Sequence, residues 1–225
     1  MVVGITGGLA TGKSLVMGIL RDFGATTFSA DEAARAVLQP AGPIVAEVVE
    51  AFGSEMIGAS GTVDRARLGR LVFADAEARR RLNQIMHPPI IRLLRAQIDA
   101  AQLDLPTGTV VAVEVPLLFE THLETWFERI IVVSASEAVQ IARLCARNGF
   151  DESEARRRLA AQWPMALKVA RADIVLSNDQ PVTALRDAVK ALWQSFGETR
   201  QKVSAPEPRG EFDPSMAGVT SQTSG

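Results

Sequence analysis

The chain has 225 residues, 47% of them hydrophobic, which suits one large domain or a core with an insertion. Its net charge of −2 gives no overall field that favours nucleic acid or an anionic membrane, and its one cysteine excludes an intramolecular disulfide. The sequence has no basic leader and no apolar run of about 20 residues. We therefore expect a cytoplasmic protein, a monomer or weak homo-oligomer, with neither nucleic acid nor membrane among its partners.

The strongest signal lies near the N-terminus, in an octet of the pattern G-x-x-x-x-G-K-S over residues 7–14. The octet follows a β-branched run and precedes an amphipathic helical pattern, which is the context that a phosphate-binding loop requires. Glycines let backbone N–H groups approach an anion, and the following helix points its positive end at the same place. Lys13 adds a charge for the β- and γ-phosphates, and Ser14 is placed to bind Mg²⁺. The loop predicts a protein that binds a nucleoside triphosphate; the alternative is an ordinary glycine-rich turn.

After the first helix, the sequence predicts a short strand over 25–29 and a helix that begins near Asp31 and runs to Leu38. Further helical patterns cover 44–52, 65–73, 76–86 and 90–101, and the last two are separated by a break at His87-Pro88-Pro89. One connection between two parallel strands does not need so many helices. We therefore expect a helical insertion that holds a second substrate.

The second half of the chain alternates buried strands with helices. Nearly all-apolar strands are expected at 110–115, 129–133 and 173–176, as in a parallel sheet covered on both faces. Helices are expected before Gly149, between Asp151 and Pro164, up to 172, and over 181–196. The pattern predicts an α/β fold with a mainly parallel sheet, helices on both faces and ligands at the carboxyl ends of the strands. Residues 198–225 show no periodic pattern of apolar residues, and we expect them to form a disordered tail.

Three classes of protein with a phosphate-binding loop differ in the motifs that lie further along the chain. A GTPase needs an Asn-Lys-x-Asp reader on a late strand, where this chain has Ser177-Asn178-Asp179 instead. A motor ATPase needs a strand that ends in Asp-Glu, whereas Glu114 lies inside an apolar run. A small-molecule kinase needs a base for an acceptor hydroxyl, positive groups over the transferred phosphoryl and a lid against water.

Candidates for these kinase roles are present. Asp31 follows the second strand, so it is either the base that accepts the hydroxyl proton or a cap of the next helix. Arg143, Arg147 and Arg158 could clamp phosphate oxygens bidentately, and the alternative is that they are surface residues. His87 either hydrogen-bonds a substrate or holds the insertion together.

Six segments, in one order along the chain, carry a resemblance to a known family. They are the phosphate loop over 4–14; Ala30-Asp31 with Ala34-Arg35, Val37 and Gln39-Pro40; Leu82-Asn83 with His87-Pro88; Pro116-Leu117-Leu118-Phe119-Glu120; Gln140-x-x-Arg143-Leu144-x-x-Arg147 with Arg158-Leu159-x-x-Gln162; and Ala172-Asp173 leading to Asn178. Together they resemble the dephospho-coenzyme A kinase family over residues 2 to 196.

The resemblance implies a P-loop fold similar to the nucleoside-monophosphate kinases, and phosphoryl transfer from Mg-ATP to the ribose 3′-hydroxyl of dephospho-coenzyme A. It implies a nucleotide-binding core at 1–30, 105–139 and 168–197, a helical acceptor domain at 31–104 and a LID at 140–167, followed by the tail at 198–225. The implied catalytic residues are Asp31 as base, with Lys13 and Arg143 stabilising the phosphate charge.

The resemblance also implies two sets of binding residues. The ATP set is Gly8, Leu9, Ala10, Thr11, Gly12, Lys13, Ser14, Leu15, Arg143, Arg147 and Asn178, with Ser14 binding Mg²⁺. The acceptor set is Asp31, Arg35, His87, Pro116, Leu117, Leu118 and Arg158.

The sequence departs from the family pattern at a few positions and leaves two other functions open. Ser29 stands where the family often has an aspartate two residues before the base, and Glu114 and Val115 stand before Pro116, where an acidic residue usually precedes an aliphatic one. A part for Ser29 or Glu114 in Mg²⁺ binding is open. Leu15 replaces a common threonine, and no glycine follows Asn178. The other functions are a kinase for a nucleotide or another alcohol, and a non-catalytic nucleotide-binding switch.

Overall fold

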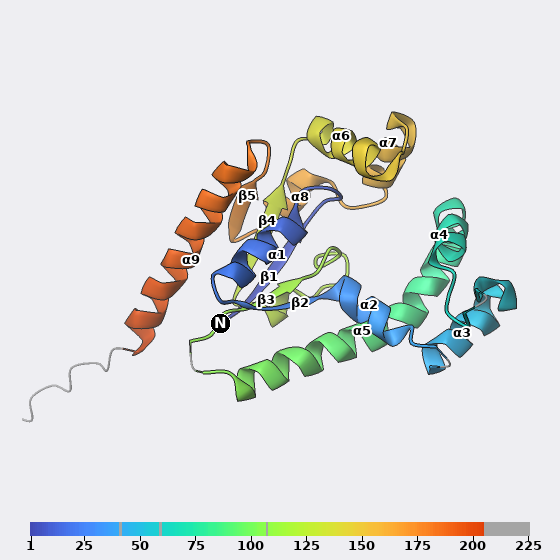
Figure 1. Ribbon diagram of the computed structural model, residues 1–225, viewed down its shortest axis with the longest axis horizontal. Coiled ribbons are helices and arrows are strands. Elements are labelled where there is room, and N and C mark those ends of the chain that lie inside the picture. The colour runs from blue at the N-terminus through green and yellow to red at the C-terminus, as the bar shows by residue number, and fades with distance from the viewer. Residues whose placement is uncertain (41, 59, 107, 205–225) are drawn as a thin grey trace, which may run out of the picture.

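The computed structural model describes residues 1–40, 42–58, 60–106 and 108–204, without the side chains of 73 and 198–204. Within these ranges, five strands form one sheet in the order β2-β3-β1-β4-β5, and every neighbouring pair is parallel (Figure 1). The strands are β1 (Val2–Gly7), β2 (Thr26–Ser29), β3 (Val111–Glu114), β4 (Arg129–Ser134) and β5 (Ile174–Ser177). The parallel α/β sheet predicted from the sequence is therefore confirmed.

Helices cover both faces of this sheet (Figure 1). The apolar side chains of α1 (Lys13–Asp22) and α9 (Val182–Ser204) pack on one face, and those of α5 (Ala76–Asp104) and α8 (Met165–Val169) pack on the other. The remaining helices are α2 (Ala30–Val37), α3 (Pro43–Phe52), α4 (Arg65–Ala74), α6 (Glu137–Asn148), α7 (Glu152–Ala160) and the 3₁₀ turns η1 (Ser54–Met56) and η2 (Glu124–Trp126).

Alternate side chains along a strand pack on opposite faces of the sheet. In β4, Ile131 and Val133 join the cluster under α1 and α9, whereas Ile130 and Val132 join the cluster under α5 and α8. Alternate side chains of a strand point to opposite faces, so a strand buried on both faces has to be apolar throughout. This is why the central strands appear in the sequence as continuous apolar runs.

The helices between β2 and β3 have a small core of their own. Val45, Val48, Met56, Val63 and Leu68 are buried together there, and Leu82 and Ile85 of α5 pack against them. Further along α5, Leu94 and Ile98 belong to the core of the sheet. The helix α5 therefore joins the insertion to the sheet.

The predicted break at residues 87–89 is wrong, because α5 runs without interruption through Pro88 and Pro89. Each proline removes one backbone donor from the helix, which normally ends or kinks it. Here α5 packs against α2, α3, α4 and the sheet, and each of its halves contributes buried side chains. These tertiary contacts outweigh the local cost of the prolines.

The predicted end of the ordered chain at 197 is also too early, because α9 continues to Ser204. The rest of the expected tail, 205–225, lies outside the described residues. In the part of the chain that the structure describes, no helix combines the length and apolar character needed to span a membrane.

Candidate active site

A cavity of about 950 Å³ opens at the carboxyl ends of the strands. It is lined by the phosphate loop, α2, α5, the end of β3 with the loop after it, α6 and the end of β5. Thirteen residues of the predicted site line it: Leu9, Ala10, Gly12, Lys13, Ser14, Leu15, Asp31, His87, Pro116, Leu117, Arg143, Arg147 and Asn178. Residues that are far apart in the sequence thus share one space large enough for a sizeable ligand.

The backbone of the phosphate loop requires glycine at position 12, just before α1. Gly12 has φ 99°, in the left-handed region, and a Cβ added there would lie 2.2 Å from Nδ2 of Asn178. The ammonium group of Lys13 donates to the carbonyl oxygen of Gly8 at 2.8 Å. Burial lowers the pKa of Lys13, and Glu114 opposes this effect. Lys13 thus lies folded back on the loop, and Glu114 and Asp31 partly offset its charge.

Two side chains hold the phosphate loop against the rest of the site. Nδ2 of Asn178 donates to the carbonyl oxygen of Thr11 at 2.8 Å. The guanidinium of Arg143 donates to the carbonyl oxygens of Ala10 at 3.2 Å and Asn178 at 2.9 Å. Leu9 and Ala10 also pack on the apolar cluster between α6 and α7. The predicted LID is therefore attached directly to the phosphate loop.

Glu114 at the end of β3 faces Ser14 of the phosphate loop. Glu114 is 7% exposed, and the Ser14 hydroxyl donates to its Oε1 at 3.4 Å. Burial raises the pKa of Glu114, and the charge of Asp31 raises it further, whereas Lys13 lowers it. A hydroxyl and a carboxylate are hard oxygen ligands, and Mg²⁺ takes one or two carboxylates beside substrate phosphates. The residues present therefore fit Mg²⁺.

Asp31 is not the cap of its helix. The side chain of Ser29 accepts from the backbone N–H of Asp31 at 3.2 Å, so Ser29 is the N-cap of α2 and the capping alternative for Asp31 is wrong. The Asp31 carboxylate is exposed, lines the cavity and interacts electrostatically with Lys13 and Glu114. It is thus available to a ligand.

One part of the cavity wall is apolar. Ile90, Ile91 and Leu94 of α5 line it together with Pro116 and Leu117. His87 lies at the same wall, and burial lowers its pKa, so the neutral imidazole is favoured. Such a wall suits a flat or apolar part of a ligand and helps to exclude water from the cavity.

Five predicted site residues do not line this cavity. Gly8 and Thr11 lie in the phosphate loop, where the Thr11 hydroxyl donates to the Gly8 carbonyl. Arg158 pairs with Glu154 on its own helix. Arg35 lines a smaller neighbouring cavity. Leu118 is fully buried in the core of the sheet and does not line the cavity, and its contact with the acceptor stays a prediction.

Sequence reasoning missed one buried charge beside the site. Lys168 of α8 is 0% exposed, and its ammonium group lies 2.8 Å from Oε1 of Glu120 and 3.1 Å from the carbonyl oxygen of Pro116. The same carboxylate accepts from the backbone N–H of Trp163. The sequence signal that could have revealed this pair is Glu120, an acidic residue at the end of the apolar run 116–120, because a buried carboxylate needs a cation nearby.

The chain matches a family model described as Dephospho-CoA kinase over residues 1–184. It belongs to the dephospho-CoA kinase family. The relatives include the dephospho-CoA kinase of Geobacillus kaustophilus, 42% identical over 80% of this chain and 88% of the relative. The dephospho-CoA kinase of Syntrophotalea carbinolica is 41% identical over 85% of this chain and 90% of that protein.

Solved structures agree with this family in fold. The chain is similar to the crystal structure of TT1252 from Thermus thermophilus, with a TM-score of 0.71 and 31% identity over 87% of this chain and 97% of that one. A dephospho-CoA kinase from Campylobacter jejuni has the same fold, with a TM-score of 0.67, 23% identity and coverage of 88% of this chain and 98% of that one. Membership of the family assigns the chain to the kinases, and the solved structures share its fold.

Proposed function

We propose that this protein transfers the γ-phosphoryl group of ATP to the ribose 3′-hydroxyl of dephospho-coenzyme A. Membership of the dephospho-CoA kinase family supports the reaction. The observation that carries it is the shared cavity, because Lys13 and Ser14 line it from the phosphate loop and Asp31 lines it from α2. A donor triphosphate on the loop and an acceptor hydroxyl at Asp31 would then meet in one space.

The chain's own residues account for the transfer. Asp31 accepts the proton of the 3′-hydroxyl while the hydroxyl oxygen bonds to the γ-phosphorus. The bond between the γ-phosphorus and the β–γ bridging oxygen breaks, and ADP leaves. Lys13 and the backbone N–H groups of the loop offset the charge of the phosphate oxygens. Arg143 and Arg147 face the same space from α6, and Asn178 holds the loop beneath the nucleotide.

The reaction is expected to need Mg²⁺, which Ser14 and Glu114 would hold beside the phosphates. Bound there, the ion supplies positive charge to the phosphate oxygens. We further propose that the α2–α5 segment is the acceptor domain and that α6 and α7 act as the LID. A cytoplasmic monomer or weak homo-oligomer suits an enzyme that consumes ATP and a small acceptor.

The experiment that tests this function is an acceptor panel with Mg-ATP. We expect phosphorylation of dephospho-coenzyme A at the 3′-position, identified by mass spectrometry and phosphorus NMR of the product. Activity on AMP but not on dephospho-coenzyme A would favour a nucleotide kinase. Tight ATP binding without transfer to any acceptor would favour a nucleotide-binding switch. The Lys13→Ala variant is the control, and it should lose both ATP affinity and turnover.

A further inference from the structure

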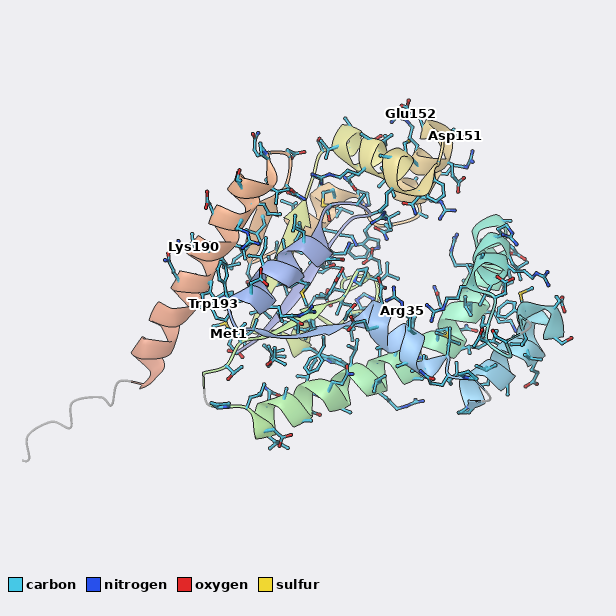
Figure 2. All side chains as sticks on the ribbon, in the orientation of Figure 1. Met1, Arg35, Asp151, Glu152, Lys190 and Trp193 are labelled. Carbon is cyan, nitrogen blue, oxygen red and sulfur yellow. The ribbon has the colours of Figure 1, made fainter. Side chains whose placement is uncertain are left out.

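A second, smaller cavity adjoins the substrate cavity beside α2. Its volume is about 270 Å³, and its wall is formed by Asp31, Ala34, Arg35, Leu38 and Arg65. Asp31 and Ala34 line both cavities, so the two spaces meet at the proposed base. Arg35 comes from α2, where Figure 2 labels it, and Arg65 is the first residue of α4. Two separate helices thus bring two guanidinium groups to one small space.

Both guanidinium groups are available to a ligand. Among the described residues, neither the side chain of Arg35 nor that of Arg65 forms a hydrogen bond or an ion pair. A neighbour on α4 differs, because Arg67 donates to the carbonyl oxygen of Glu55. Arginine presents a planar fork that grips phosphate oxygens in pairs, so two unpaired arginines at one cavity form a site that suits a phosphate or diphosphate group.

The spacing along α2 fits one part of the acceptor. Asp31 and Arg35 are four residues apart, which places them on one face of the helix and about 6 Å apart along its axis. In dephospho-coenzyme A, one ribose ring and one methylene group separate the 3′-hydroxyl from the 5′-diphosphate. An acceptor with its hydroxyl at Asp31 can therefore bring its diphosphate to Arg35, one helical turn away.

We propose that Arg35 and Arg65 form the subsite for the 5′-diphosphate of the acceptor. This inference rests on the proposed function, and it adds Arg65 and a basis for acceptor selection. The apolar wall and Asp31 could accept many ribose hydroxyls, whereas the two arginines favour a nucleoside that carries a diphosphate. The negative charge of Asp31 repels phosphate oxygens, which keeps the diphosphate at the arginine end of α2.

The test compares Arg35→Ala, Arg65→Ala and the double variant with wild type. The matched control is Arg70→Ala, because Arg70 is another exposed arginine of α4 and does not line either cavity. Initial rates are measured with dephospho-coenzyme A and with adenosine, which keeps the 3′-hydroxyl but has no diphosphate. Binding of dephospho-coenzyme A is measured separately by calorimetry.

Each single variant should raise KM for dephospho-coenzyme A by about tenfold to a hundredfold, as expected for a lost charge-assisted contact. KM should change more than kcat, and the preference for dephospho-coenzyme A over adenosine should fall by a similar factor. Arg70→Ala should keep the wild-type preference. An unchanged KM for dephospho-coenzyme A, or an equal loss on adenosine, would overturn the subsite.

The calorimetry separates this inference from the proposed function. If wild type binds dephospho-coenzyme A without phosphorylating it, the function fails, and weaker binding by the two variants still supports the subsite. If wild type transfers phosphate to dephospho-coenzyme A and the variants bind it as tightly as wild type, only the subsite fails. If wild type does not bind dephospho-coenzyme A, both fail.

Discussion

Replacement of Lys168 by methionine should destabilise the protein strongly. The Lys168 side chain is fully buried, and that of its partner Glu120 is 17% exposed, with 2.8 Å between the ammonium nitrogen and Oε1. Methionine keeps the length of the side chain but leaves the carboxylate of Glu120 in a buried place without its cation. Breaking a buried pair in this way costs about 3–5 kcal/mol, which in a chain of this size lowers Tm by about 6–20 °C.

The assay is urea unfolding followed by circular dichroism, supported by thermal melts. The control is Arg186→Met, because the Arg186–Asp22 pair has both side chains more than half exposed and should contribute less than about 1 kcal/mol. The double variant Lys168→Met/Glu120→Gln should regain most of the lost stability, since no uncompensated charge is left. A loss below about 1 kcal/mol for Lys168→Met, or a double variant no more stable than the single one, would refute the argument.

Three further predictions concern the cavity. Asp31→Asn should leave ATP affinity near wild type but lower kcat by about a hundredfold or more, and a wild-type kcat in stopped assays would exclude Asp31 as the base. Gly12→Ala should weaken ATP binding in calorimetry because its Cβ meets Asn178, whereas Gly18→Ala, with open space around it, should raise stability by about 0.5–1 kcal/mol. Burial raises the pKa of Glu114 in the folded protein above its usual value of 4.5. Stability is therefore lost as the pH rises from that usual value through the folded pKa, because the unfolded chain ionises this group more readily. In urea titrations, Glu114→Gln should therefore be more stable relative to wild type at pH 7 than at pH 4, while it loses activity. The same difference from wild type at both pH values would contradict this.

Local patterns in the sequence were enough to predict the sheet and the phosphate loop. The strands β1, β3 and β4 are buried on both faces, so their apolar character is continuous and easy to recognise. The loop is equally recognisable, because Gly12, Lys13 and Ser14 follow one another directly in a single turn. These features depend on neighbours in the sequence, and the structure confirms the fold that they predicted.

Features that depend on distant residues could not be predicted in this way. The helix α5 continues through Pro88 and Pro89 because side chains on either side of the prolines pack against the helices of the insertion and against the sheet. The position of Asp31 illustrates the same limit, since the sequence allowed it to be a cap or a base. Only the hydrogen bond from its backbone to Ser29 decided that it is not the cap.

The sequence by itself determined that the chain binds a triphosphate on a parallel sheet, because glycine spacing and apolar periodicity act over a few residues. The tertiary structure decided which groups surround that loop. It buried Lys168 against Glu120, removed Leu118 from the cavity and brought Arg35 and Arg65 to one space beside Asp31. Burial and charge pairing are properties of residues that meet only after folding, so no local pattern encodes them.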